Sequence, residues 1–311
     1  MFIIPYLVAY AAIAVFIGAV LLRIVFWTKM PAHVRWELYP VAHEGKKASY
    51  GGSYLEEPEW WTKKRHVSLW AEAKAMFIEI VFLAALWEHN RKMWFRSFPF
   101  HFGLYLIISA TGIMVFASLL ALVWPVAISS WFGGVLQVST IVFAVAGMVL
   151  SLFGAIGLIH RRLTDEDLKD FTSASDIFNL LFFVGAFGLA FITWIATDHD
   201  FGLVSYFVFN LVSFKMAALP VTGTQAALFG LTVISLSALL AYIPLTHMSH
   251  FVGKYFAYHS IRWNDAPNLK NGKEEDEIEG LLTLPVSWSA EHIGGDGKKS
   301  WAQVATEEVK K

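Results

Sequence analysis

The chain has 311 residues, of which 56% are hydrophobic, with a mean hydropathy of +0.53 and a formal net charge of −1. This composition is typical of a membrane protein, and the near-zero charge gives no indication of nucleic acid, so we expect no nucleic-acid partner. The chain contains no cysteine, which excludes disulfides, thiolate zinc sites, cysteine-ligated iron–sulfur clusters and covalently attached c-type haem.

Five apolar segments are long enough to cross a bilayer, because about 20 residues at a helical rise of about 1.5 Å cover the hydrocarbon core. These segments are 2–28, 102–124, 134–159, 177–197 and 225–245. The segment 70–88 is less apolar, since it contains Glu72, Lys74, Glu79 and Glu88, and it predicts an amphipathic helix at the interface. We therefore expect an all-α membrane protein with five transmembrane helices and one cytoplasmic interfacial helix.

Basic residues set the expected orientation of the spans. Lys and Arg are frequent in 29–97, in 160–170 and after 250, whereas 125–133 has none and 198–221 has only Lys215. This asymmetry predicts the N-terminus outside and the C-terminus in the cytoplasm, as expected for a multi-pass protein of the cell inner membrane.

The spans divide the chain into four expected regions. They are a first transmembrane helix at 1–28, a cytoplasmic loop at 29–97, a four-helix membrane bundle at 98–250 and a cytoplasmic tail at 251–311. The loop is rich in aromatic residues, which suits either the membrane interface or a docked partner. Trp288 and Trp301 are unusual in a solvated tail, so we interpret residues 264–311 as an extended arm that orders on a partner. A mobile terminus is the alternative.

Histidines at the cytoplasmic ends of the spans are the candidate ligand residues. An imidazole at the edge of hydrocarbon needs a partner, and a haem iron takes two of them, which points to His101 and His250. Pro99 is expected in the first turn of the second span, which places His101 in the same turn. His247 and His250 share one face if the helix continues past Pro244, so that one binds iron while the other pairs with a propionate.

Two further groups lie near the third and fourth spans. His160 and Arg161 end the third apolar run, where His160 suits either a cofactor site or the level of the lipid phosphates. Asp176 and Asn179 stand near the start of the fourth span, and we interpret both as helix-start residues. No nucleophile constellation is present, and we expect no catalytic residue in this chain.

Two stretches, GLIHRRLTDEDLKDFTSASDIFNLL and YIPLTHMSHFVGKYF, together with the order of the spans, resemble the gamma subunit of respiratory nitrate reductase. The stretches WELYP, YGGSY, SFPFHFGLYL and WSAEHIGGDGKKSWAQVA resemble more closely the membrane cytochrome b subunits of sulfate reducers' transmembrane redox complexes, of the DsrM and TmcC type. The resemblance implies two b-type haems, with His101 and His250 as the metal ligands on the cytoplasmic side. The outer pair falls on Thr111 and Thr232, which do not ligate haem, so we expect one haem b.

A second haem would have to use His247, His160 or His89, all on the cytoplasmic side. The resemblance also implies a menaquinone site and a cytoplasmic iron–sulfur partner of the heterodisulfide-reductase-like kind. A periplasmic multihaem cytochrome c is a further implied partner, through other subunits. We therefore expect an electron-transfer subunit that links the quinone pool to a cytoplasmic redox partner. The alternative is a non-redox membrane anchor; a transporter is disfavoured because the spans carry almost no central charge.

Overall fold

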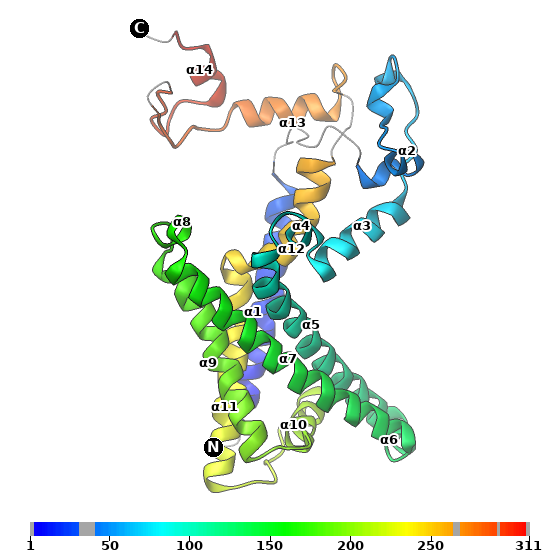
Figure 1. The fold of residues 1–311 in the computed structure, drawn as a ribbon, viewed down its shortest axis with the longest axis vertical. Helices are drawn as coiled ribbons and strands as arrows, with labels where there is room; N and C mark the ends of the chain where they lie inside the picture. Colours follow the sequence, from blue (N-terminus) through cyan, green and yellow to red (C-terminus); the bar gives the residue numbers. More distant parts are fainter. Residues whose placement is uncertain (1–2, 31–40, 264–267, 291–292, 309–311) are drawn as a thin grey trace. The chain divides into compact units, whose positions relative to one another are not determined.

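The computed structural model describes residues 3–30, 41–263, 268–290 and 293–308, which form helices and their connections (Figure 1). Five helical segments in this part of the chain are long and apolar enough to cross a membrane. They are α1 (Ile3–Thr28), α5 (Arg91–Val123), α7 (Trp131–Thr164), α9 (Ala174–Ala196) and Gly223–Leu245, in which a 3-10 turn (Ile243–Leu245) follows α11 (Gly223–Tyr242). The predicted all-α class and the number and order of the candidate spans are confirmed.

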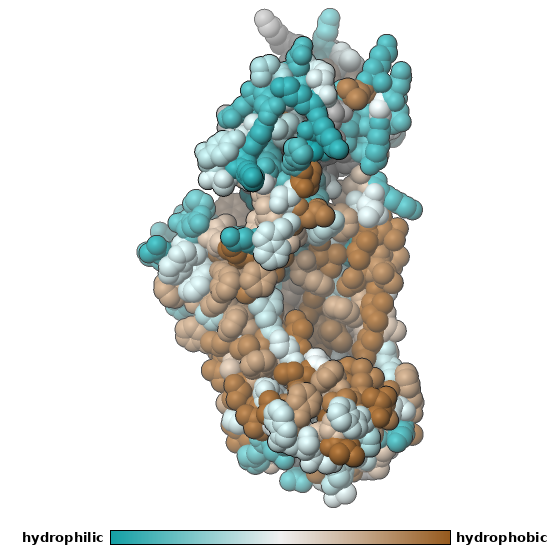
Figure 2. Space-filling model, turned by 90° about the vertical axis from the view of Figure 1, so that its right-hand side faces the viewer, coloured by the Kyte–Doolittle hydropathy of each residue, from teal (hydrophilic) through white to brown (hydrophobic). Residues whose placement is uncertain are grey.

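The chain divides into two compact units. The bundle unit comprises Met1–Gly18 and Met76–His247, and the second unit comprises Ala19–Ala75 and Met248–Lys311, so that α1 contributes to both. Large apolar side chains on the bundle unit point outward; Ile108, Val138 and Phe153 are 67%, 60% and 64% exposed. Figure 2 shows mainly hydrophobic side chains over the spanning helices. A surface of this kind is unfavourable in water and fits contact with lipid.

α5 begins well before the apolar run that predicted it. Asn90 caps this helix by accepting a hydrogen bond from the backbone N–H of Met93 at 3.0 Å. Pro99 therefore lies inside the helix, and His101 lies ten residues after Arg91. The prediction that Pro99 and His101 share the first turn is wrong, because the helix extends past the apolar segment into a basic and aromatic stretch. A proline here removes one backbone hydrogen bond without ending the helix.

α5 and α7 approach each other closely through small residues. A Cβ added to Gly103 would lie 2.4 Å from Oγ of Ser151 and 2.7 Å from the carbonyl oxygen of Gly147. A Cβ added to Gly154 would lie 2.4 Å from the backbone nitrogen of Phe100. Small residues at such crossings let helix backbones meet, which is how spans associate when lipid removes the hydrophobic driving force.

The predicted helix at 70–88 is interrupted, which corrects its expected continuity. It forms α3 (Leu69–Phe82) and α4 (Ala84–His89), separated by Leu83 with φ 51°. The indole N–H of Trp94 donates to the carbonyl oxygen of Phe82 at 2.7 Å, and Glu79 Oε2 accepts from the N–H of Ala85 at 2.9 Å. These tertiary and local bonds satisfy backbone groups that the break exposes. Neither Gly nor Pro marks the break in the sequence.

The segment 198–221, expected to be an outer loop, contains the helix α10 (Gly202–Val212). This helix contributes to a buried core made of Tyr6, Ala9, Leu203, Phe207, Leu219, Phe229 and Val233. The rings of Tyr6 and Phe207 stack with centroids 4.4 Å apart, and the Tyr6 hydroxyl donates to the Ala217 carbonyl oxygen at 3.1 Å. α10 therefore joins α1 to α11 within the bundle unit.

A buried carboxylate starts α10. Asp198 is 6% exposed, and its two oxygens accept hydrogen bonds from the backbone N–H groups of Leu203 at 2.8 Å and Val204 at 3.0 Å. Burial raises the pKa of this carboxyl above its ordinary value of 3.8, and the two backbone hydrogen bonds act in the opposite direction. Because the folded pKa is raised, the contribution of this group to stability is complete below pH 3.8 and falls as pH rises through the folded pKa.

Asp198→Ala is expected to destabilise the bundle unit by about 1–2 kcal/mol, because two helix-start N–H groups lose their acceptor. Asp198→Asn keeps one acceptor oxygen and removes the buried charge, so it is expected to lose less stability and to flatten the pH dependence. Thermal unfolding of both variants in detergent at acidic and neutral pH measures this. Equal losses for Ala and Asn at every pH would contradict the assignment.

The second unit contains α12 (His250–Phe256), a π-helical turn (Ala257–Arg262), α13 (Lys273–Leu282) and α14 (Trp301–Thr306). The tail, which we expected to be an extended arm, thus holds two short helices. Trp288 and Trp301 contact each other, with ring centroids 6.0 Å apart, and Val286, two residues before Trp288, is 1% exposed. The second unit also contains the short helix α2 (Lys46–Ser49) and three 3-10 turns, Ala42–Glu44, Tyr54–Glu56 and Trp60–Thr62. The bundle unit contains two further short helices, α6 (Pro125–Ile128) and α8 (Glu166–Lys169).

Candidate functional site

His101 is a half-buried residue of α5 whose ring is held by the turn that precedes it. Its Nδ1 lies 2.8 Å from the backbone carbonyl oxygen of Ser97 and 3.3 Å from the Ser97 hydroxyl. A carbonyl only accepts, so this contact favours the tautomer with hydrogen on Nδ1 and the lone pair on Nε2. The ring of Phe100 lies edge-on at 5.4 Å and contacts Phe183 of α9 at 5.0 Å. Metal-ligating histidines are oriented in this way, so His101 would suit the binding of a haem iron.

His247 belongs to a polar cluster that joins α9 to the end of α11. The hydroxyl of Tyr242 donates to Oδ1 of Asn179 at 2.8 Å, and Nδ2 of Asn179 lies 3.4 Å from Nε2 of His247. Asn179 is the sixth residue of α9 and is 5% exposed; it lies near the helix start, as predicted, but makes buried tertiary contacts and does not cap the helix. The capping role falls on Asp176 alone, which forms a capping box with Ser173. An amide with two side-chain partners in a buried position fixes the ends of these two helices against each other.

His250 is the first residue of α12 in the second unit, and its side chain is exposed. α11 ends at Tyr242, and Thr246 is extended, with φ −113° and ψ −176°. His247 follows in a separate 3-10 turn, His247–Ser249. The condition under which His247 and His250 share one face, continuation of the fifth span, is therefore not met.

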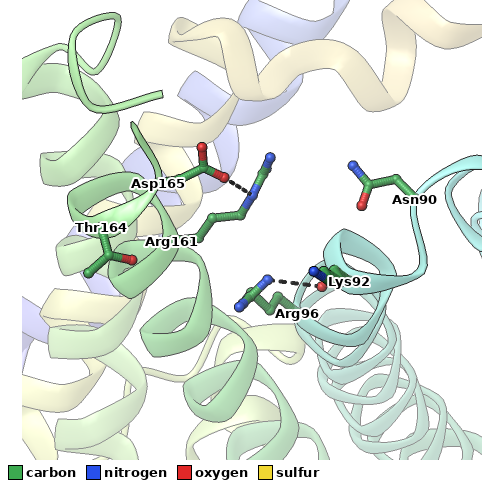
Figure 3. Close-up of a pocket in the computed structure, with 6 residues that line it drawn as sticks. All are labelled: Asn90, Lys92, Arg96, Arg161, Thr164 and Asp165. Carbon is green, nitrogen blue, oxygen red and sulfur yellow. Dashed lines mark hydrogen bonds and ion pairs between the residues drawn. The ribbon is translucent and has the colours of Figure 1, made fainter. Parts of the chain in front are cut away.

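Arg161 lines an open pocket of about 330 Å³ between the start of α5 and the end of α7 (Figure 3). Its Nε donates to Oδ2 of Asp165 at 3.2 Å, and one terminal nitrogen lies 3.0 Å from Sδ of Met93. The pocket is completed by Asn90, Lys92, Arg96 and Thr164. The pocket has three cationic side chains and one carboxylate, which favours the binding of an anionic group. His160 precedes Arg161 but is exposed, on α7.

The two threonines at the expected outer ligand positions make local hydrogen bonds. Thr232 is 6% exposed, and its hydroxyl lies 2.6 Å from that of Thr193 on α9 and donates to the Leu228 carbonyl oxygen at 3.0 Å. Thr111 is exposed and donates to the Ile107 carbonyl oxygen at 2.9 Å. Neither position supplies a nitrogen ligand, and the buried hydroxyl pair holds α9 against α11. These residues do not fit an outer haem.

The other histidines of the described residues do not form a further metal site. Among the described residues, no group of three or more His, Asp or Glu side chains is placed to hold a bare metal ion. His33 and His292, and the WELYP stretch, lie outside the described residues. Sequence reasoning missed Ser97 and the role of Asn179. The four-residue spacing of Ser97 and His101 was a signal for the first, whereas a buried Asn inside an apolar run was the signal for the second.

The fold and these residues define a multi-pass helical membrane protein with imidazoles near the ends of its spans. The nitrate reductase gamma subunit family matches residues 84–264, more than half of the 311 residues, and the chain belongs to this family. The family is one of membrane cytochrome b subunits that transfer electrons and contain haem b. No curated protein matches the chain. The matched region includes His101, His160, Arg161, His247 and His250, and the predicted family resemblance is confirmed at this level.

Proposed function

We propose that this chain is a membrane cytochrome b subunit that transfers electrons between the menaquinone pool and a cytoplasmic iron–sulfur partner. The observation that carries the proposal is His101, a half-buried imidazole in a spanning helix whose Nδ1 is held by the Ser97 carbonyl oxygen, inside the family-matched region. A haem b bound here would supply one-electron chemistry to a chain that has no cysteine.

The ligands of this haem are proposed to be His101 and His250, with the N-terminus outside and the C-terminus in the cytoplasm of the inner membrane. Arg161 and His247 are the candidates for contact with the propionates, since both present nitrogen groups near helix ends. His160 is the weakest member of the set, because no hydrogen bond of its ring is found in the described part of the chain, whereas His247 contacts Asn179. α3 and α4 are proposed to lie at the cytoplasmic interface.

The proposal has one haem rather than two. The Thr193–Thr232 hydroxyl pair and the local bond of Thr111 support it, because both expected outer ligand positions lack a nitrogen donor. Without an outer haem, more than about 20 Å of helix would separate the outer face from the iron. This distance favours a quinone site close to the cytoplasmic-side haem, or a route through another subunit.

The absence of cysteine supports a division of labour in which iron–sulfur clusters belong to a partner. A heterodisulfide-reductase-like cytoplasmic subunit, and a periplasmic multihaem cytochrome c reached through other subunits, fit the proposed closeness to the DsrM and TmcC type. A non-redox membrane anchor is the second candidate, favoured by the contacts that order the tail, such as the Trp288–Trp301 pair.

An optical spectrum with haem quantitation tests the proposal. The complex purified from membranes is expected to show b-type absorbance, one haem per copy of this chain, and reduction of that haem by a menaquinol analogue. Two haems per chain would contradict the one-haem arrangement but keep the redox function. Complete absence of b-type absorbance from an intact complex would leave the anchor as the function.

A further inference from the structure

The second unit carries a basic pocket in a part of the chain that the family match does not include. The pocket has a volume of about 490 Å³ and is lined from two segments, Glu44–Lys47 and Tyr54–Ser68. Its charged residues are Lys46, Lys47, Lys63, Lys64 and Arg65, opposed by Glu44 and Glu57. Five cations against two carboxylates leave an excess of three positive charges in the pocket lining, and Glu56 and Glu59, which do not line it, reduce the excess over residues 46–70 to two.

The carboxylates of the pocket are already engaged by neighbouring groups. Glu57 pairs with Lys47 through one oxygen and with Lys63 at 3.2 Å through the other. Glu44 accepts a hydrogen bond from the Ser53 hydroxyl at 2.7 Å. In the described part of the chain, no carboxylate lies within ion-pair distance of Lys46 or Lys64, both of which are exposed. The pocket is therefore built to receive an anion.

Large apolar and aromatic side chains stand beside this pocket and face outward. Tyr50, Trp61 and Val67 are 72%, 51% and 51% exposed, and Leu69 and Trp70, at the start of α3, are 74% and 79% exposed. A purely solvated basic surface does not expose so many large apolar side chains within 21 residues, 50 to 70. The surface combines ammonium groups with Trp and Tyr.

We propose that this basic–aromatic surface, residues 46–70, binds the phosphate headgroups of anionic phospholipids in the leaflet where α1 ends. Trp and Tyr beside lysines are typical of the headgroup layer, where rings sit at the acyl boundary and cations contact phosphates. Protein interfaces, in contrast, are depleted of lysine, and four of the five cations here are lysines. A membrane surface with anionic headgroups accounts for both the lysines and the exposed aromatic side chains.

The segment that connects α1 to this surface also supports binding to anionic phospholipids. The spanning helix α1 ends at Thr28, and Lys46 follows 18 residues later, so the surface is tethered to a membrane span. This inference does not depend on haem, and it holds whether the chain is a cytochrome or an anchor. A failure of the proposed electron transfer therefore leaves it intact.

The cysteine-free sequence allows a direct test on the full chain. Thr62→Cys, at an exposed position beside Trp61, carries a nitroxide spin label in nanodiscs of phosphatidylcholine with or without phosphatidylglycerol. With phosphatidylglycerol, collisions of the label with oxygen are expected to rise and collisions with a water-soluble nickel chelate to fall several-fold. Asp276→Cys, exposed on α13, is the matched control and is expected to stay accessible to nickel in both discs.

Charge removal is the second arm. Lys46→Gln combined with Lys63→Gln and Lys64→Gln is expected to return the Thr62 label to nickel accessibility in phosphatidylglycerol discs, with an unchanged melting temperature of the chain. A label that stays accessible to nickel in both discs overturns the proposal and leaves an acidic protein as the occupant. Equal shielding with and without phosphatidylglycerol also overturns it, because headgroup charge would then have no role.

Discussion

Replacing His101 with alanine is expected to remove nearly all b-type haem from the purified complex. The imidazole sits half-buried in α5 with Nδ1 held by the Ser97 carbonyl oxygen, and alanine has no atom to replace the Nε2 ligand. A bis-imidazole haem that loses one axial ligand is weakly held and is lost during purification. The measurement is the reduced-minus-oxidised difference spectrum together with extracted haem per chain.

Controls separate loss of a ligand from loss of the fold. His199→Ala changes an exposed imidazole between α9 and α10 and is expected to leave the spectrum intact. Ser97→Ala keeps the backbone carbonyl that holds the ring, so it is also expected to retain haem. His250→Ala is expected to match His101→Ala. If His250→Ala retains haem while His247→Ala loses it, the second ligand is His247.

Gly103→Ala is expected to destabilise the bundle unit by about 1–3 kcal/mol, despite the better helix propensity of alanine. The added methyl group would lie 2.4 Å from the Ser151 hydroxyl oxygen, 2.6 Å from its backbone nitrogen and 2.7 Å from the Gly147 carbonyl oxygen. Two of these atoms are backbone, so α5 and α7 must separate. Because His101 lies two residues away, haem occupancy is expected to fall as well. Thermal unfolding in detergent and haem content measure the two effects.

Gly112→Ala is the matched control on the same helix. Nothing lies within 4 Å of a Cβ added there, and the position is exposed. It is expected to be neutral or slightly stabilising, since the gain in helix propensity meets no clash. Equal destabilisation by both substitutions would mean that α5 and α7 do not pack through Gly103.

The apolar runs were sufficient to predict five spans and an all-helical class, because a bilayer forces each crossing segment to satisfy its own backbone hydrogen bonds. The ends of the helices were harder to predict from the sequence. α5 begins at Arg91, eleven residues before residue 102, where the predicted span began. Hydropathy marks where the apolar run starts, but a helix can begin earlier, in a polar segment. The break at Leu83 is accompanied by a hydrogen bond from the Trp94 indole to the Phe82 carbonyl oxygen, 12 residues apart along the chain.

The candidate site, too, was predicted from the sequence only in part. The sequence alone determined the candidate histidines, the missing cysteines and the family resemblance, because these depend on residue identity and order. Only the tertiary structure decided which polar groups meet. Asn179 contacts Tyr242 and His247 from another helix, and Thr193 meets Thr232 across α9 and α11. Such pairs depend on which faces of two helices pack together, and that depends on side-chain volumes at every crossing, which a pattern along one chain does not specify.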